Sequence, residues 1–139
     1  MNRIRQLSLY LTAGAIGALV NSLAVWIAGS IGLTTALGAQ IAPTLTPNWL
    51  YPRLTWGAIW GLLFFVPLKI TGNARKRIIW QGLLVSLGPT VAQLFYFFPT
   101  GGKGLLGFQL GIITPLPLFV IVFNAIWGIV AAAWIAAAQ

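Results

Sequence analysis

The side chains best placed for chemistry inside the apolar stretches of this sequence are uncharged amides and hydroxyls: Asn21, Ser86, Thr90, Gln93 and Asn124. Such groups donate and accept hydrogen bonds, and they do not exchange protons near neutral pH. Ser86, Thr90 and Gln93 are spaced four and then three residues apart, which places them on one stripe of a helix. We expect these residues either to bond neighbouring helices together or to line a polar path or a small-ligand site.

The ionisable residues exclude most enzyme chemistry. The sequence has eight Lys and Arg residues and no Asp, Glu, His or Cys. General acid–base catalysis uses His or carboxylates, and zinc and iron sites need Cys, His or carboxylate ligands. We therefore predict that the protein is not an enzyme and holds no metal or other cofactor.

The basic residues are expected to contact the bilayer surface. We predict lipid-phosphate contacts for five of them, by snorkelling or by attraction to anionic headgroups: Arg53, Lys69, Arg75, Lys76 and Arg77. Arg53 has no acidic partner in the sequence, and its alternative role is to attract an anion at an entrance. No nucleic-acid partner is expected, because no basic face with interleaved aromatic residues exists outside the apolar stretches.

Composition predicts an integral membrane protein. Of the 139 residues, 59% are hydrophobic and 6% are charged, whereas about a quarter of the residues in a soluble domain are charged. A helix that crosses a bilayer needs about 20 apolar residues, with a range of roughly 17–25. Four stretches approach this length, at residues 7–31, 54–70, 78–98 and 116–138. We predict a single all-α membrane domain, residues 1–139, with four transmembrane helices.

Two connectors rich in proline and glycine, residues 32–52 and 99–117, separate these stretches. We expect a short interfacial helix in each connector, at residues 34–42 and 105–113. In the first connector Pro43 should end the helix, because the residue before a proline avoids the α conformation.

An internal repeat predicts how the helices are arranged. Residues 58–61, with the sequence AIWG, return at 125–128, residues 37–42 are echoed at 106–111, and a Thr-Pro lies between the two strings in both cases. We predict a duplicated hairpin, with copies at residues 7–70 and 78–138 and a basic turn at 71–77. Gln40 and Gln109, like Trp60 and Trp127, should occupy equivalent places. The tryptophan rings either fill space or donate their N–H to Asn21, Asn124 or a carbonyl freed by Pro89.

The distribution of positive charge predicts the orientation. Six basic residues lie before the first span or around the middle turn, and two lie in the connectors. By the positive-inside rule, both termini and the turn at residues 71–77 should be cytoplasmic, and the bacterial inner membrane is the expected location. The two hairpins would then be parallel copies, related by an axis along the membrane normal.

Small residues at four-residue spacing predict close helix contacts: Gly14, Ala18 and Ser22; Gly57 and Gly61; Asn124, Gly128, Ala132 and Ala136. Such faces pack inside a bundle, or they point outward toward a homo-oligomer or a larger membrane complex. We expect a non-catalytic protein that works through helix packing, as an accessory or assembly subunit or as a lipid- or pigment-binding partner of a larger complex. The alternative is a small channel or facilitator for a neutral solute or an anion.

Overall fold

The structure, a computed structural model, describes residues 2–39, 41–106 and 115–139. Its regular elements in these ranges are all helical, which confirms the predicted all-α class. In chain order they are α1 (Arg3–Ser30), α2 (Leu33–Ala36), α3 (Pro47–Trp60), the 3₁₀ helix η1 (Gly61–Phe65), α4 (Ala74–Ala92), the π-helix η2 (Gln93–Phe97), α5 (Phe98–Thr100) and α6 (Pro115–Ala138).

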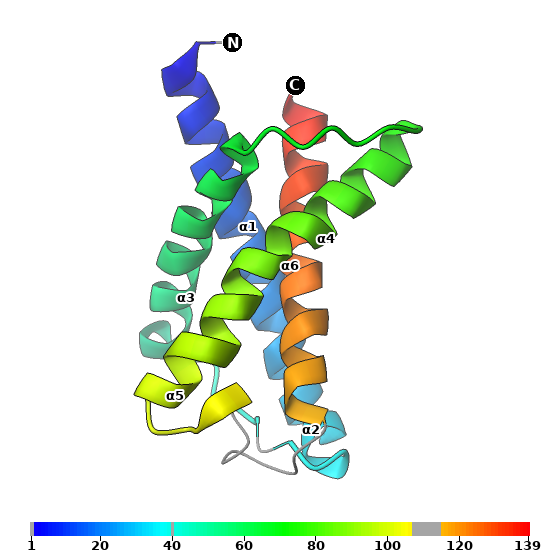
Figure 1. The fold of residues 1–139 in the computed structure, drawn as a ribbon. Helices are drawn as coiled ribbons and strands as arrows, with labels where there is room; N and C mark the ends of the chain where they lie inside the picture. The colour runs from blue at the N-terminus through cyan, green and yellow to red at the C-terminus, as the bar shows by residue number, and fades with distance from the viewer. Residues whose placement is uncertain (1, 40, 107–114) are drawn as a thin grey trace.

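Three helical runs are long and apolar enough to cross a membrane: Arg3–Ser30, Ala74–Thr100 and Leu116–Ala138. Helix α3 has 14 residues, which is shorter than these runs, although η1 continues it. Figure 1 places both termini and the segment between η1 and α4 at one end of the molecule, and α2 and α5 at the other. Helices α1, α3 and α6 run alongside each other, and α4 passes obliquely in front of α6.

Side-chain caps set the starts of the helices. The Asn2 side chain accepts a hydrogen bond from the Arg5 backbone N–H at 2.9 Å, and Asn73 accepts one from Lys76 at 2.8 Å. Thr46 caps α3, with Pro47 in its first turn, where a missing N–H costs nothing. The starts predicted at residues 54 and 78 were therefore wrong, because they followed the onset of apolar residues and ignored capping groups. Arg75, Lys76 and Arg77 consequently lie in the first turn of α4 rather than in a loop.

Two prolines, Pro67 and Pro89, have different effects on their helical runs. Backbone before Pro67 is extended at Val66, so the second helical run ends at Phe65 and not at Ile70 as predicted. Pro89 lies inside α4, and the helical run continues through η2 to Thr100. Pro89 has no N–H for the carbonyl one turn earlier. The π-helix η2 begins at Gln93, about one helical turn after this proline.

The first interfacial helix is shorter than predicted. It covers Leu33–Ala36 instead of residues 34–42, because Gly38 ends it well before Pro43. The N–H of Gly38 bonds to the Thr35 carbonyl and that of Ala39 to the Thr34 carbonyl, which is a Schellman motif. Gly38 has φ +91°, a conformation that glycine adopts without steric cost. The second predicted helix, at 105–113, lies largely outside the described residues.

Glycines bring the helix backbones into contact. A methyl group added at Gly14 would lie 2.9 Å from the Gly61 Cα and closer still to the Gly57 carbonyl oxygen. In α4 and α6, a methyl group at Gly82 would lie 2.7 Å from the Gly128 carbonyl carbon. In lipid, where little hydrophobic force acts between helices, close backbone approach supplies the packing energy. These small-residue faces are used inside the bundle.

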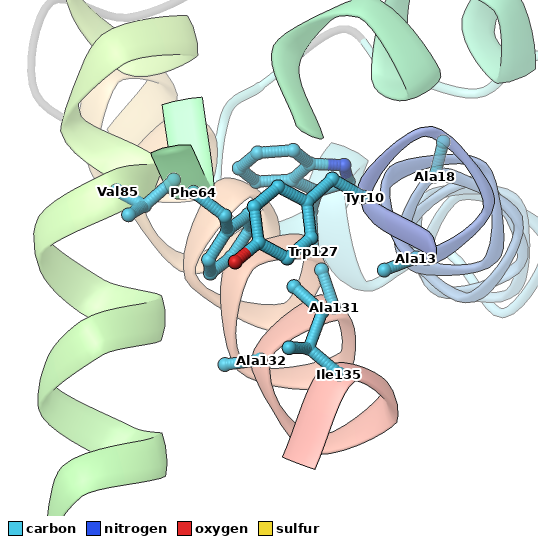
Figure 2. Close-up of a cluster of buried hydrophobic side chains, with 9 residues drawn as sticks. All are labelled: Tyr10, Ala13, Ala18, Phe64, Val85, Trp127, Ala131, Ala132 and Ile135. Carbon is cyan, nitrogen blue, oxygen red and sulfur yellow. The ribbon is translucent and has the colours of Figure 1, made fainter. Parts of the chain in front are cut away.

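An apolar cluster fills one half of the bundle (Figure 2). It contains side chains from α1, η1, α4 and α6: Tyr10, Ala13, Ala18, Phe64, Val85, Trp127, Ala131, Ala132 and Ile135. A second cluster lies toward the end that carries α2 and α5, and it contains Ala39, Leu94, Phe98, Leu116 and Val120.

The glycine contacts predict that Gly128→Ala destabilises the protein. The added methyl would meet the backbone carbonyl of Gly82, and overpacking of this kind costs about 1–3 kcal/mol. Gly88→Ala is the matched control, because its methyl would meet only the end of the Leu63 side chain and alanine favours a helix by about 1 kcal/mol over glycine. Thermal unfolding in mild detergent, followed by circular dichroism, measures both variants. Equal melting temperatures for the two would contradict this account.

Candidate functional site

Arg53 points from α3 into the bundle. It lies four residues before Gly57 and eight before Gly61, so all three residues share the face of α3 that packs on α1. Its Nε donates a hydrogen bond to the Ser22 hydroxyl at 2.9 Å, and its Nη2 donates to the Asn21 side-chain oxygen at 2.8 Å. Antiparallel packing of α1 and α3 thus places Gly14 against Gly61, and Ser22 against Arg53.

Asn21 connects this arginine to a third helix. The side chain is buried, its oxygen accepts from Arg53, and its Nδ2 donates to the Phe123 carbonyl of α6 at 2.6 Å. The two bonds together fix which way the amide is turned. Trp49 flanks the guanidinium on the other side, with Cζ of Arg53 4.7 Å from the ring centroid, within the range of a cation–π contact.

A second polar link joins α4 to α6. The Nδ2 of Asn124 donates to the Thr90 hydroxyl at 3.1 Å, and that hydroxyl donates to the Ser86 carbonyl at 2.7 Å. The Ser86 hydroxyl donates to the Leu83 carbonyl within its own helix. The Thr90 hydroxyl therefore acts as acceptor and donor at once, and it orients the amide of Asn124 without an ionised group.

Two cavities adjoin these polar groups. The outer cavity has a volume of about 420 Å³ and the inner cavity about 320 Å³, which are sizes typical of ligand pockets. Four residues line both: Asn21, Arg53, Gln93 and Asn124. The outer cavity also meets Trp49 and Lys103, whereas the inner one is walled mostly by rings, from Pro52, Trp56, Trp60, Pro89, Phe97 and Trp127.

Trp127 separates the inner cavity from the apolar cluster. Its side chain is 3% exposed, and its indole N–H donates to the Gly14 carbonyl at 3.0 Å. The ring lies 6.1 Å from that of Phe64, and Figure 2 shows the aromatic and aliphatic side chains packed around it. The acceptors predicted from the sequence were wrong, because at Gly14 the absence of a side chain leaves the carbonyl accessible to the ring.

The structure brings together most of the predicted polar interior. Asn21, Gln93 and Asn124 line the same cavities, with Thr90 hydrogen-bonded to Asn124 behind them. Ser86 does not line either cavity. Gln40 and Gln109 lie outside the described residues.

The two tryptophans of the repeat line the same cavity but in different surroundings. Trp60 and Trp127 both face the inner cavity; Trp60 is half-buried, and Trp127 is buried. Their equivalence under the proposed repeat stays a prediction.

Among the predicted lipid-contacting residues, Arg53 differs from the rest. Lys69, Arg75, Lys76 and Arg77 are exposed at the end of the molecule that carries the termini, and their contact with lipid phosphate stays a prediction. Arg53 instead bonds to side chains of α1, a contact that the sequence analysis missed. The signal was present: extending the Gly57 and Gly61 stripe back by one turn reaches Arg53, and extending Gly14 and Ala18 forward reaches Ser22.

The electrostatics of the site favour a negatively charged ligand. The guanidinium is half-buried and the sequence has no carboxylate side chain to pair with it. Arg53 donates hydrogen bonds to the uncharged side-chain oxygens of Asn21 and Ser22. Such a site can bind and orient an anion, and it offers no general acid or base near neutral pH.

Comparison with protein family models, curated proteins and solved structures gives no match to this chain.

The hydrogen bond between Asn21 and Arg53 predicts energetic coupling. Asn21→Ala should cost about 1–3 kcal/mol, because it leaves a guanidinium N–H without its acceptor, and it should cost less in an Arg53→Gln background. A double-mutant cycle on reversible unfolding in detergent measures the difference, expected to be about 0.5–3 kcal/mol. Ser86→Ala with Arg53→Gln is the control pair and should be additive. Additivity of the Asn21 pair as well would contradict the coupling.

Proposed function

We propose that this protein is a non-catalytic, multi-pass membrane protein that holds a lipid-like or pigment-like amphiphile within its helix bundle, as an accessory or assembly subunit of a larger membrane complex. The observation that carries the proposal is the pair of ligand-sized cavities. They share a polar rim of Asn21, Arg53, Gln93 and Asn124, and one of them has aromatic walls. A polar group beside an apolar chamber is suited to a molecule with both kinds of surface.

The proposal includes a fourth membrane crossing by α3 and η1. Together they cover residues 47–65, and the rises of α and 3₁₀ helices give a length of roughly 30 Å. This length is close to the hydrocarbon thickness of about 30 Å. The course of α3 between the two ends of the molecule in Figure 1 supports the crossing, and the contacts of Arg53 with neighbouring side chains lower the cost of a charge within it.

Equivalent glycine contacts support the proposed duplication. Gly14 meets Gly61 in the first hairpin and Gly82 meets Gly128 in the second. Gly61 and Gly128 end the two AIWG strings, and Gly14 and Gly82 lie at corresponding places in the preceding helices. Two parallel copies of one hairpin would produce this correspondence.

The cytoplasmic position of both termini and of the basic segment remains part of the proposal, as does the bacterial inner membrane. It rests on the excess of Lys and Arg at one end of the molecule. An oligomer or complex would have to use surfaces other than the glycine faces, which the bundle already covers. Exposed apolar residues on α4, including Leu84, Leu87 and Val91, are available for lipid tails or for a partner helix.

A facilitator for an anion or a neutral solute is the second candidate. Arg53 beside an outer cavity favours it, because a buried cation would attract anions. A conducting path would also need polar groups beyond Trp127, where the described residues form the apolar cluster around Phe64 and Ile135. This arrangement favours binding over passage.

Single cysteines test the number of crossings, and the native chain contains none that would interfere. Thr44→Cys should react with a membrane-impermeant maleimide from the side opposite to Thr71→Cys and Gln139→Cys, because α3 and η1 lie between the first two positions. The measurement is labelling of intact cells against labelling of opened membranes. Reaction of Thr44→Cys and Thr71→Cys from the same side would show that α3 and η1 do not cross.

Purification in mild detergent tests the proposed role. A tightly held lipid or pigment should accompany the protein in roughly equimolar amount, identified by mass spectrometry of an organic extract, together with a membrane protein partner. Liposomes that contain the purified protein alone should show no anion or solute flux above empty liposomes. Saturable flux that Arg53→Gln abolishes would instead establish the second candidate.

A further inference from the structure

We infer that the amphiphile carries an oxyanion, a phosphate or a carboxylate, which Arg53 binds at the shared rim while the apolar part of the same molecule occupies the inner cavity. This inference rests on the proposed function, since it names the chemistry of the molecule that the bundle holds. It assigns the head of the ligand to α1, α3 and α6, and its tail to the aromatic chamber.

The side chains that accept hydrogen bonds from Arg53 are uncharged. Removing a cation from water is costly unless an opposite charge and hydrogen bonds compensate for it. Ser22 and Asn21 supply hydrogen bonds, and Trp49 supplies a ring face, but none of them carries a negative charge. Because the sequence contains no Asp or Glu, a compensating anionic side chain cannot come from anywhere in this chain. An anion from outside would complete the site.

The hydrogen-bonding geometry favours an oxyanion. A guanidinium has five N–H donors, and the bonds to Ser22 and Asn21 occupy one on Nε and one on Nη2. Within the part of the chain that the structure describes, the donors left without a partner belong to Nη1 and to the second hydrogen of Nη2, which together form a fork. Such a fork binds two oxygens of one phosphate or carboxylate. Asn124 uses Nδ2 toward Thr90 and retains a second N–H for the rim, beside the amide of Gln93.

The inner cavity favours an attached apolar chain over a free ion. Its volume is about 320 Å³. If a methylene group takes up about as much space as a water molecule in the liquid, about 30 Å³, the cavity holds roughly ten such groups. Trp56, Trp60 and Trp127 contribute ring surface, and Ala18 and Gly57, which pack closely against each other, complete the wall between α1 and α3. Trp56 also meets Phe97 edge-on, with centroids 5.7 Å apart, so that rings from α3 and η2 meet on one wall of this cavity. An inorganic anion would leave these apolar walls uncovered.

Binding of n-dodecyl phosphate to the full-length protein in dodecyl maltoside tests the inference. The detergent supplies the same chain length with a neutral head, so that saturable binding must depend on the phosphate. Isothermal titration and quenching of tryptophan fluorescence should give one site per chain. Inorganic phosphate, the second probe, should bind at least roughly tenfold more weakly, because it gains nothing from the apolar cavity. Dodecanoate in a third titration should also bind, since the fork accepts either oxyanion.

Two variants and a matched control locate the site. Arg53→Gln should weaken n-dodecyl phosphate binding roughly tenfold or more, as expected for a charged hydrogen bond. Arg5→Gln removes the same charge at the opposite end, where Arg5 is exposed, and should leave the affinity unchanged. Trp60→Leu leaves Arg53 in place, and it should weaken binding of n-dodecyl phosphate but not of inorganic phosphate. Circular dichroism of each variant verifies folding, and Trp60→Leu still tests the inference if Arg53→Gln fails to fold.

Several results would overturn the inference: no saturable binding, equal affinity for inorganic phosphate and n-dodecyl phosphate, or equal loss of affinity in Arg53→Gln and Arg5→Gln. These results are separable from failure of the proposed function. A neutral lipid or pigment that accompanies the purified protein, with no binding of n-dodecyl phosphate, would retain the proposed function and reject the oxyanion. If the protein purifies from the membrane without an amphiphile or a partner but binds n-dodecyl phosphate, the oxyanion site is retained and the proposed function is rejected.

Discussion

The antiparallel contact between α1 and α3 determines where the bundle is closed and where it is open. At Gly14 and Gly61 the two backbones touch, because neither residue has a side chain. Along the same stripe toward the α2 end, the facing residues grow to Ala18 and then to Ser22 and Arg53. Larger side chains on the same line require the helices to separate. The cavities lie at the end where this stripe carries its largest members.

The same contact makes the position of Trp127 possible. The indole N–H of Trp127 donates to the Gly14 carbonyl, and the oxygen of this carbonyl also lies against Gly57 of α3. The ring then lies across the bundle between the inner cavity and the apolar cluster. Since lipid provides little hydrophobic force between helices, a buried hydrogen bond and a large ring contribute much of what holds α6 against α1. Position 14 thus joins α1 both to α3 and η1, through the glycine contacts, and to α6, through the tryptophan hydrogen bond.

Sequence patterns predicted the helical class and most of the polar interior, because both depend on residue type and helical spacing alone. Asn21, Gln93 and Asn124 line the same cavities in the structure, because an amide in an apolar helix finds hydrogen-bond partners in the bundle interior and not in lipid. Helix boundaries depend on caps such as Asn73 and Thr46, whose effect extends the helix beyond the apolar stretch. The inward position of Arg53 could not be decided from its own type, because an arginine near a helix start can equally reach lipid phosphate. Its register with Ser22 decides the matter, and register is a property of two helices together.

Under the proposed duplication, the proposed binding site depends on differences between the two copies. The offset between the AIWG strings matches Arg53 with Val120, and the offset between the Thr-Pro pairs matches Ser22 with Thr90. One hairpin thus carries a cation where the other carries an apolar residue of the second cluster. If both positions were arginine, a third cation would face the outer cavity, which Arg53 and Lys103 already line, and the sequence has no carboxylate side chain to offset it. If both were valine, the amides of Asn21 and Asn124 would remain with no charge to select an anion. Arg53 is the charged member of the shared rim, whose other residues, Asn21, Gln93 and Asn124, supply neutral donors and acceptors, and Lys103 adds a second cation at the outer cavity.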